Sequence, residues 1–341
     1  MTRNATSSSG ASSGRLQPGA AAASRFSFPV VSEFTWIWFG TILLFLLSAL
    51  LAPGTVTRGS ILAMLPFAGI LAIVATGQTV VIQQRGLDMS SAGMLSLAGV
   101  LVAKFGFVVG SVTVAVLLTA MFGAIVGVVN GLLISRVAIT PLVATLAVNA
   151  LLIGGVRTLT GNVPISVPEQ MQVISHAQIA GVPSTVAFAL IFVIAVWVVT
   201  RKTAIGRRFV AVGVNPRTAE AAGVRVFAYQ VGAYMASGLC FAVAGMLLAG
   251  FIGNASQTAG NDYLMPAIAA VVVGGTPFTG GRGSVIASAV AALFMAQLGQ
   301  MVLALGAGSA VQLLVQAAAI LAATTIRYLP AATRAFRTIK S

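Results

Sequence analysis

Long runs of apolar residues recur along the chain and are separated by short polar connections. A helix of about 20 apolar residues crosses the hydrocarbon core of a bilayer, so each run of about this length predicts a membrane-spanning helix. The runs fall at 34–52, 61–82, 89–103, 108–134, 143–159, 185–199, 228–252, 263–275, 285–305 and 310–326. The pattern therefore predicts an all-α integral membrane protein with about ten transmembrane helices.

Positive charges fall unevenly on the two sides of this topology. With the N-terminus inside, only Arg58, Lys104 and Arg157 of the 19 Lys and Arg residues lie outside, which leaves sixteen inside. Cytoplasmic segments of membrane proteins carry such an excess. The distribution predicts a multi-pass protein of the bacterial cytoplasmic (inner) membrane with both termini in the cytoplasm.

The same topology divides the chain into a membrane domain and its flanking segments. Residues 1–30 are rich in Ser, Ala and Gly without an apolar core, and we expect a disordered cytoplasmic tail. Residues 31–329 form the transmembrane domain, and 330–341 a cytoplasmic C-terminal tail. Two long connections interrupt the domain: 160–184, expected on the outer side, and 200–226, a strongly charged segment expected on the inner side.

Two of the runs, 89–103 and 263–275, are short for a full crossing and predict half-helices that end inside the protein. Each follows a Gly-x-Asp triplet that ends in Asp88 or Asp262. An Asp carboxylate caps the free amides of a first helical turn well, so both residues are candidate N-caps. Because one Asp is expected at the inner side and the other at the outer side, the pattern hints at inverted repeats, whose broken helices frame transport paths.

Composition argues against an enzyme. Only 7% of the residues are charged, against roughly 25% in soluble proteins. The five acids are scattered, and single copies of His176 and Cys240 exclude a His/Cys metal cluster or an intrachain disulfide. The net charge of +14 follows from the positive-inside distribution, so we expect no nucleic-acid partner.

The chain also lacks the residues of its own nucleotide site. A P-loop needs Gly-Lys-Ser/Thr, and none of Lys104, Lys202 and Lys340 follows a glycine. An ATP-driven function would therefore need a partner that binds ATP.

Neutral polar side chains within the runs are candidates for a solute path. Gln78, Asn130 and Asn149 could hydrogen-bond a passing polyol, and Asp88 and Asp262 could gate it. The alternative is that the amides hold helices together and the acids are N-caps. Asn130 follows glycines at 123 and 127 and precedes one at 131, a spacing typical of close helix packing.

Three stretches resemble the ribose-type (monosaccharide) permeases of ABC importers. They are Gly86-Leu87-Asp88-Met89-Ser90, the segment 206–224 and the segment 262–285 with its glycine-rich end. The resemblance covers roughly residues 35–328. The chain departs from the family pattern at Ala222-Gly223-Val224, where a Ser-Gly-Ile triplet is usual, and after Ser90.

The resemblance implies a mechanism and a set of partners. Two permease chains, alike or unlike, would form a central path in the membrane lipid. A soluble binding protein would deliver the solute outside, and ABC ATPase subunits with ATP and Mg²⁺ would dock inside, so no cofactor is expected on this chain. Segment 203–224 would be the coupling element, with ATPase docking through Arg207, Arg208, Asn215, Glu220 and Gly223.

The function expected is therefore import of a sugar or a similar small polar solute. A polyol, a furanone signal, a nucleoside or a branched-chain amino acid are alternatives within the same transporter class. A stand-alone ion-coupled carrier or channel is a second alternative. Such proteins usually carry ionisable residues in mid-membrane, and here every acid and the histidine fall at the end of a run or in a connection.

Overall fold

A computed structural model describes residues 34–322 and 325. The N-terminal tail expected over 1–30 and the C-terminal tail expected over 330–341 lie outside the described residues.

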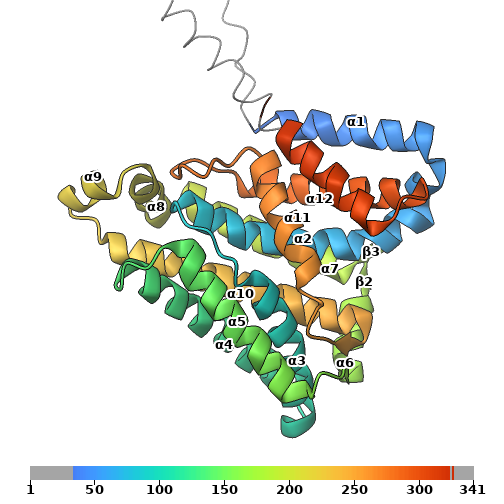
Figure 1. Cartoon of the computed structure of the whole chain (residues 1–341), viewed down its shortest axis with the longest axis horizontal. Helices are drawn as coiled ribbons and strands as arrows, with labels where there is room; N and C mark the ends of the chain where they lie inside the picture. Colours follow the sequence, from blue (N-terminus) through green and yellow to red (C-terminus); the bar gives the residue numbers. More distant parts are fainter. Residues whose placement is uncertain (1–33, 323–324, 326–341) are drawn as a thin grey trace, which may run out of the picture. The chain divides into compact units, whose positions relative to one another are not determined.

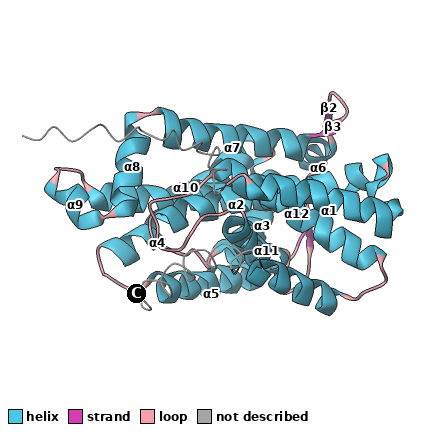
Figure 2. Cartoon of the chain, turned by 90° about the horizontal axis from the view of Figure 1, so that it is seen from above, coloured by secondary structure: helices cyan, strands magenta, loops and turns pink. Residues whose placement is uncertain are grey.

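The described chain is almost entirely helical (Figures 1 and 2). In chain order its helices are α1 (Trp36–Leu51), the 3-10 helix η1 (Pro53–Val56), α2 (Arg58–Gln83), α3 (Ser91–Val109), α4 (Val112–Ser135), α5 (Pro141–Thr160), α6 (Glu169–His176), α7 (Ser184–Lys202), α8 (Ala204–Val214), α9 (Pro216–Ala221), α10 (Val226–Ile252), α11 (Asn261–Val273) and α12 (Val285–Ala304). A further apolar helix covers Ser309–Ala322. Four two-residue strands form two antiparallel pairs, β1 (Ile165–Ser166) with β4 (Asn254–Ala255) and β2 (Gln178–Ile179) with β3 (Val182–Pro183).

Each of the ten predicted runs corresponds to an apolar helix. Seven of these helices, α2, α3, α4, α5, α7, α10 and α12, are long and apolar enough to cross a membrane. The other three, α1, α11 and Ser309–Ala322, have 10–17 residues. The prediction of an all-α membrane protein is confirmed.

The expectation of two half-helices is wrong for the first of them. α3 has 19 residues, which is about 28 Å of helix, and ends at Gly110, whose φ of +70° closes the last turn. The apolar run stops before Lys104, but this side chain is exposed on the helix surface and a lysine can extend its charge towards water, so the helix continues past it. The second short run is a short helix, since α11 has 13 residues.

Three helices form the centre of the molecule and the others surround them. α10 packs along α2, α3 and α4, and α2 also packs against α7, α11 and α12. Most of α2, α3 and α10 is buried, whereas α4, α5 and α7 keep broad outward faces. Those faces carry exposed large apolar side chains such as Leu151 and Ile191. In a membrane such faces contact lipid tails.

The glycine spacing on α4 produces the close packing that the sequence predicts. A Cβ added to Gly123 would collide with Ala242 and the Gly238 carbonyl, and one added to Gly127 would collide with the backbone of α10 at Tyr234. Only glycine lets the two backbones approach this closely. α4 and α10 are therefore fixed against each other beside Asn130.

The two long connections lie at opposite ends of the helices. Figures 1 and 2 both place α8 and α9 at one end and β2 and β3 at the other. α6 also belongs to this second end, because a Cβ on Gly250, near the C-terminus of α10, would collide with Met171 and Ser175 of α6. Segments 160–184 and 200–226 are thus positioned to face opposite sides of a membrane.

Candidate functional site

The connection between α2 and α3 holds a fully buried carboxylate. Asp88 Oδ1 accepts hydrogen bonds from Ser90 N at 3.0 Å and Ser90 Oγ at 2.5 Å, and Oδ2 accepts one from Ser237 Oγ at 3.1 Å. Asn130 Nδ2 lies 3.5 Å from Oδ1. A buried carboxylate is costly unless donors surround it, and these described donors are all uncharged. The polar junction around Asp88 therefore surrounds the carboxyl group with neutral hydrogen-bonding side chains and backbone.

The N-cap expectation for Asp88 is corrected by this geometry. The N-cap of α3 is Ser90, whose side chain makes no capping hydrogen bond. Asp88 stands two residues earlier, where its carboxylate accepts from the Ser90 amide and reaches α10 through Ser237. Its hydrogen bonds therefore join the connection to a neighbouring helix as well as to the start of α3.

Three further candidates from the sequence meet at the same place. Gln78 Nε2 donates to the Asp88 carbonyl at 2.5 Å, Asn130 Nδ2 donates to Ser90 Oγ at 2.9 Å, and Asn149 Oδ1 accepts from Gly93 N at 2.7 Å. Helices α2 and α4 are thereby tied to the residues just before α3, and α5 is tied to its first turn. These bonds support the helix-contact alternative for the amides, and a role in the solute path stays a prediction.

Asp262, the fifth candidate, lies apart from this junction. It is exposed in the first turn of α11, after an N-cap at Gly260 that makes no side-chain capping bond, so its N-cap expectation is also corrected. A carboxylate in the first turn still interacts favourably with the helix dipole. Gly260 itself lies against Ala92 in the first turn of α3, where an added Cβ would overlap the Ala92 carbonyl. The starts of α3 and α11 therefore meet.

Asp262 lines a cavity of about 630 Å³ between α2, α10, α11 and α12. The polar residues of its wall are Asn254, Ser256, Thr258, Asp262, Tyr263, Gln300, Gln312 and Gln316. The amide oxygen of Gln300 has no hydrogen-bond partner among the described residues, while its Nε2 donates to the Ser60 carbonyl at 3.2 Å. The polar part of the wall thus consists of amides, hydroxyls and the Asp262 carboxylate, groups that can hydrogen-bond a polyhydroxyl solute.

Part of this cavity wall has a signal in the sequence. Gln312 and Gln316 are four residues apart, a spacing that places both on one face of a helix. Gly299 leaves room for Gln312, whose Nε2 would lie 2.6 Å from a Cβ added there. The sequence does not show that α12 and the helix Ser309–Ala322 meet around these amides; this contact is seen only in the tertiary structure.

The charged segment 200–226 forms the helices α8 and α9. α8 is amphipathic: Phe209 and Val212 are buried, while Arg207 and Arg208 are exposed. Asn215 caps α9, because its side chain accepts a hydrogen bond from Thr218 N at 3.2 Å. The buried face fixes α8 on the membrane domain and leaves its charges for a partner.

The two remaining docking candidates lie at the end of α9. Glu220 is exposed on the last turn, and Gly223 follows with a φ of +78° in open space. A positive φ favours glycine because other residues crowd their Cβ there. The five residues predicted to dock an ATPase therefore share one exposed segment, and docking itself stays a prediction.

Arg85 anchors α8 to the end of α2. From the sequence it is only one of the sixteen positive charges expected on the inner side. Its Nε donates to the Gly213 carbonyl at 2.9 Å, and its guanidinium also donates to the Val214 carbonyl. Gln84 Nε2 adds a bond to the Phe209 carbonyl at 2.7 Å. These three carbonyls belong to the second half of α8, so side chains from the C-terminal end of α2 bind this half of the helix.

The glycine-rich turn between α11 and α12 completes this anchor. Gly281 N donates to the Gln83 carbonyl at 2.8 Å, and Arg201 donates to the Gly283 carbonyl at 2.9 Å. The turn joins α11 to α12, which pack against each other. The contact of Gln83–Arg85 with α8 and with this turn is called the α8 anchor below.

Comparisons with known proteins agree with this architecture. A family model described as "Branched-chain amino acid transport system / permease component" matches residues 60–324. The ribose import permease protein RbsC of Bacillus subtilis is 34% identical over 308 residues, which cover 89% of this chain and 95% of that protein. The galactofuranose transporter permease protein YtfT of Escherichia coli is 32% identical over 70% of each chain.

A more distant relative and the solved structures complete the comparison. The fructose import permease protein FrcC of Rhizobium meliloti is 29% identical over 74% of this chain and 75% of that protein. No solved structure matches. Because the family model covers most of the chain and RbsC aligns along nearly all of it, the chain belongs to the family of branched-chain amino acid transport system permease components.

Proposed function

We propose that this chain is the transmembrane permease subunit of an ABC importer and that its solute is a sugar. The observation that carries the proposal is the similarity to ribose, galactofuranose and fructose permeases along most of the chain. A branched-chain amino acid, which the family description mentions, has two charged ends that need charged partners. Among the described residues, the wall of the cavity at Asp262 has one carboxylate and no basic side chain, so the carboxylate of an amino acid would find no charged partner there, which favours an uncharged solute.

The energy for import comes from a partner. ABC ATPase subunits, which bind ATP and Mg²⁺, dock on α8 and α9, and a soluble binding protein delivers the sugar at the opposite end. A second permease chain completes the path. The exposed charges of Arg207 and Glu220 and the capped, compact form of α9 support docking by this segment.

The orientation follows from the side on which the ATPase acts. We place α8, α9 and both termini in the cytoplasm, as the excess of Lys and Arg on that side supports. The cavity at Asp262 lies near the N-terminal end of α2, and the α8 anchor lies at its C-terminal end. The cavity then opens towards the outer side, where the binding protein releases the sugar.

The α2–α3 connection transmits motion from the ATPase to the helices. Arg85 holds α8 at one end of this short segment, and Asp88 holds Ser237 of α10 and contacts Asn130 of α4 at the other. A shift of α8 therefore pulls on the buried junction that joins four helices. Packed interfaces of this kind switch between discrete arrangements, which suits alternating access.

The proposal is tested by extracting the chain from its native membrane after mild crosslinking and identifying the co-purifying proteins by mass. An ATPase with Walker motifs and a secreted binding protein are expected. The binding protein is then titrated with monosaccharides, polyols, nucleosides and branched-chain amino acids. A chain that is recovered alone, or uptake that continues without the ATPase, would contradict the proposal, and preferential binding of an amino acid would overturn the sugar assignment.

A further inference from the structure

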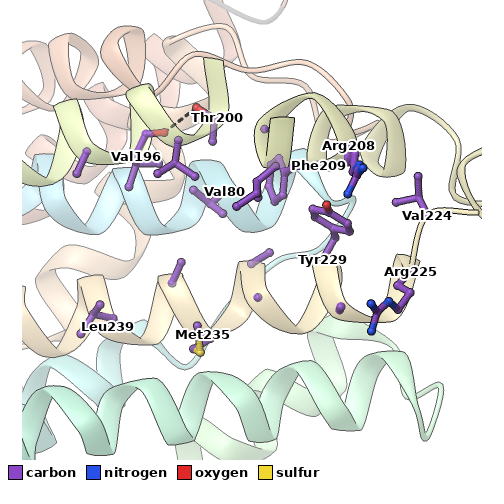
Figure 3. A pocket seen from close by; sticks show the side chains of 18 of the residues that line it. Val80, Val196, Thr200, Arg208, Phe209, Val224, Arg225, Tyr229, Met235 and Leu239 are labelled. Atoms are coloured by element: carbon purple, nitrogen blue, oxygen red, sulfur yellow. Dashed lines mark hydrogen bonds between the residues drawn. The ribbon is translucent and has the colours of Figure 1, made fainter. Parts of the chain in front are cut away.

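A second cavity, of about 840 Å³, lies between α2, α7, α8 and α10. Figure 3 shows Val196 of α7 and Leu239 of α10 on its two sides, with Val80 of α2 and Phe209 of α8 between them. Most of the other lining residues are also apolar, and the Thr200 hydroxyl is engaged with the Val196 carbonyl at 2.7 Å. Such a wall does not suit a sugar, which needs many hydrogen bonds.

The cavity is basic at one end only. Arg208 and Arg225 lie at the end next to α8 and α9, with Tyr229 between them, and Leu239 lies towards the other end (Figure 3). Within the described part of the chain, neither arginine side chain forms a hydrogen bond or an ion pair, and both residues are exposed. Two unpaired guanidinium groups at the mouth of an apolar cavity attract an anion with an apolar body.

The dimensions of the cavity match one leaflet of a bilayer. Its lining on α10 extends from Arg225 to Cys240, which is about 22 Å of helix. Half of a bilayer with its headgroups is about 20–22 Å thick. When Cys240 lies near the midplane, Arg225 therefore reaches the level of the lipid headgroups.

The cavity also borders surfaces that contact lipid. α7 exposes Ile191, Ile194 and Val198, and Met235 of α10 is part of the cavity wall and 44% exposed. These apolar side chains lie on the membrane-spanning helices and need lipid rather than water around them. An acyl chain can thus enter the cavity sideways from the bilayer.

We propose that this cavity binds an anionic phospholipid. An acyl chain of the lipid lies in the apolar part of the cavity, and its phosphate lies between Arg208 and Arg225. Basic pockets between transmembrane helices bind anionic headgroups at the cytoplasmic side. The site rests on the orientation proposed above. It assigns Arg208 to the lipid rather than to the ATPase, and it places the lipid in contact with Phe209 on the buried face of α8.

The test is native mass spectrometry of the full-length purified chain titrated with phosphatidylglycerol or with phosphatidylcholine of the same acyl chains. The wild-type chain is expected to retain phosphatidylglycerol preferentially. The double variant Arg208→Gln/Arg225→Gln is expected to lower its affinity about 30-fold, which corresponds to about 2 kcal/mol, since a basic residue near an anionic headgroup contributes roughly 1 kcal/mol. The control Arg207→Gln/Arg217→Gln removes the same charge from residues outside the cavity wall.

A second pair of variants tests the acyl-chain part of the site. Gly232 lines the cavity, and a Cβ added to it meets nothing within 4 Å, so Gly232→Leu should fill the cavity without a clash and displace the lipid. Gly154→Leu makes the same change in open space on α5 and should not affect binding. Thermal unfolding of all variants identifies any that fail to fold.

The outcomes separate the proposal from two simpler explanations. An equal loss of phosphatidylglycerol affinity in both double arginine variants would mean that the lipid binds a diffuse basic surface, and would overturn the proposed site. If phosphatidylglycerol binding is lost in the Arg208/Arg225 variant but is unchanged in Gly232→Leu, the lipid contacts the protein through its headgroup alone. This result would also overturn the proposed site, because no acyl chain would occupy the cavity. Equal retention of phosphatidylcholine and phosphatidylglycerol by the wild-type chain would remove the anionic specificity.

Discussion

Replacing Gly213 by alanine is expected to weaken the coupling of uptake to ATP hydrolysis while the chain stays folded in the membrane. Gly213 lies in the last turn of α8, where its carbonyl accepts from Arg85. A Cβ added there would lie 2.9 Å from Gly281 N and 3.0 Å from Gly281 Cα, and closer still to the Gln83 carbonyl. All three atoms are backbone atoms, so no flexible side chain can move aside.

Two opposing energies set the size of the effect. Alanine favours a helix over glycine by about 1 kcal/mol, which would stabilise α8 itself. Overpacking a closed contact costs about 1–3 kcal/mol, and a clash with backbone on two sides belongs near the upper end. The net loss at the α8 anchor is then about 1–2 kcal/mol, which corresponds to a change of about 5- to 30-fold in the equilibrium that α8 controls.

The assay is the number of solute molecules imported per ATP hydrolysed, measured in proteoliposomes that contain the permease, its ATPase and its binding protein. Gly213→Ala should lower this ratio, with normal membrane insertion and thermal unfolding within a few degrees of the wild-type chain. Gly154→Ala is the matched control, because its added Cβ meets nothing within 4 Å. A wild-type ratio in Gly213→Ala would refute the role given to the α8 anchor.

Further variants test the other parts of the site. Glu220→Lys and Gly223→Val should leave the protein in the membrane and uncouple ATP hydrolysis from uptake in the same assay; normal coupling in both would remove the docking assignment of this segment. Asp88→Ala leaves buried donors unpaired, at about 1–3 kcal/mol each, and should lower the unfolding temperature in detergent, whereas exposed Asp262→Ala should shift it little. Arg85→Lys keeps the charge but loses the two-pronged contact, so coupling should fall without loss of folding; unchanged coupling would contradict its anchoring role.

The helices could be predicted from the sequence because each one depends on a continuous run of apolar residues. A bilayer requires about 20 apolar residues per crossing, and every predicted run matches an apolar helix. The end of α3 is the exception, because the apolar run ends at a charged residue, Lys104, that is exposed on the helix surface and does not end the helix. The glycine spacing on α4 was informative for the same local reason, since small residues four apart predict a close helix contact.

The α8 anchor could not be predicted because its bonds join segments that are distant in sequence. Arg85 donates to carbonyls 128 and 129 residues away, and backbone carbonyls carry no sequence signature. Its φ of +64° is unusual for a residue with a side chain, and nothing in the surrounding residues indicates it. The cavity at Asp262 depends in the same way on the meeting of α12 with the following helix.

Asp88 and Asp262 show what a short motif can predict and what it cannot. Both follow a glycine two residues earlier; Asp88 precedes the first residue of α3 by three positions, and Asp262 is the second residue of α11. Asp88 is nevertheless buried among hydrogen-bond donors from α10 and the α2–α3 connection, while Asp262 is exposed at a cavity. The motif therefore specifies a break in the backbone, and the neighbouring helices decide the environment of the carboxylate. If the two motifs belong to inverted repeats, then the repeat preserves the course of the chain, while the neighbouring helices place one acid in a buried junction and the other in a cavity wall.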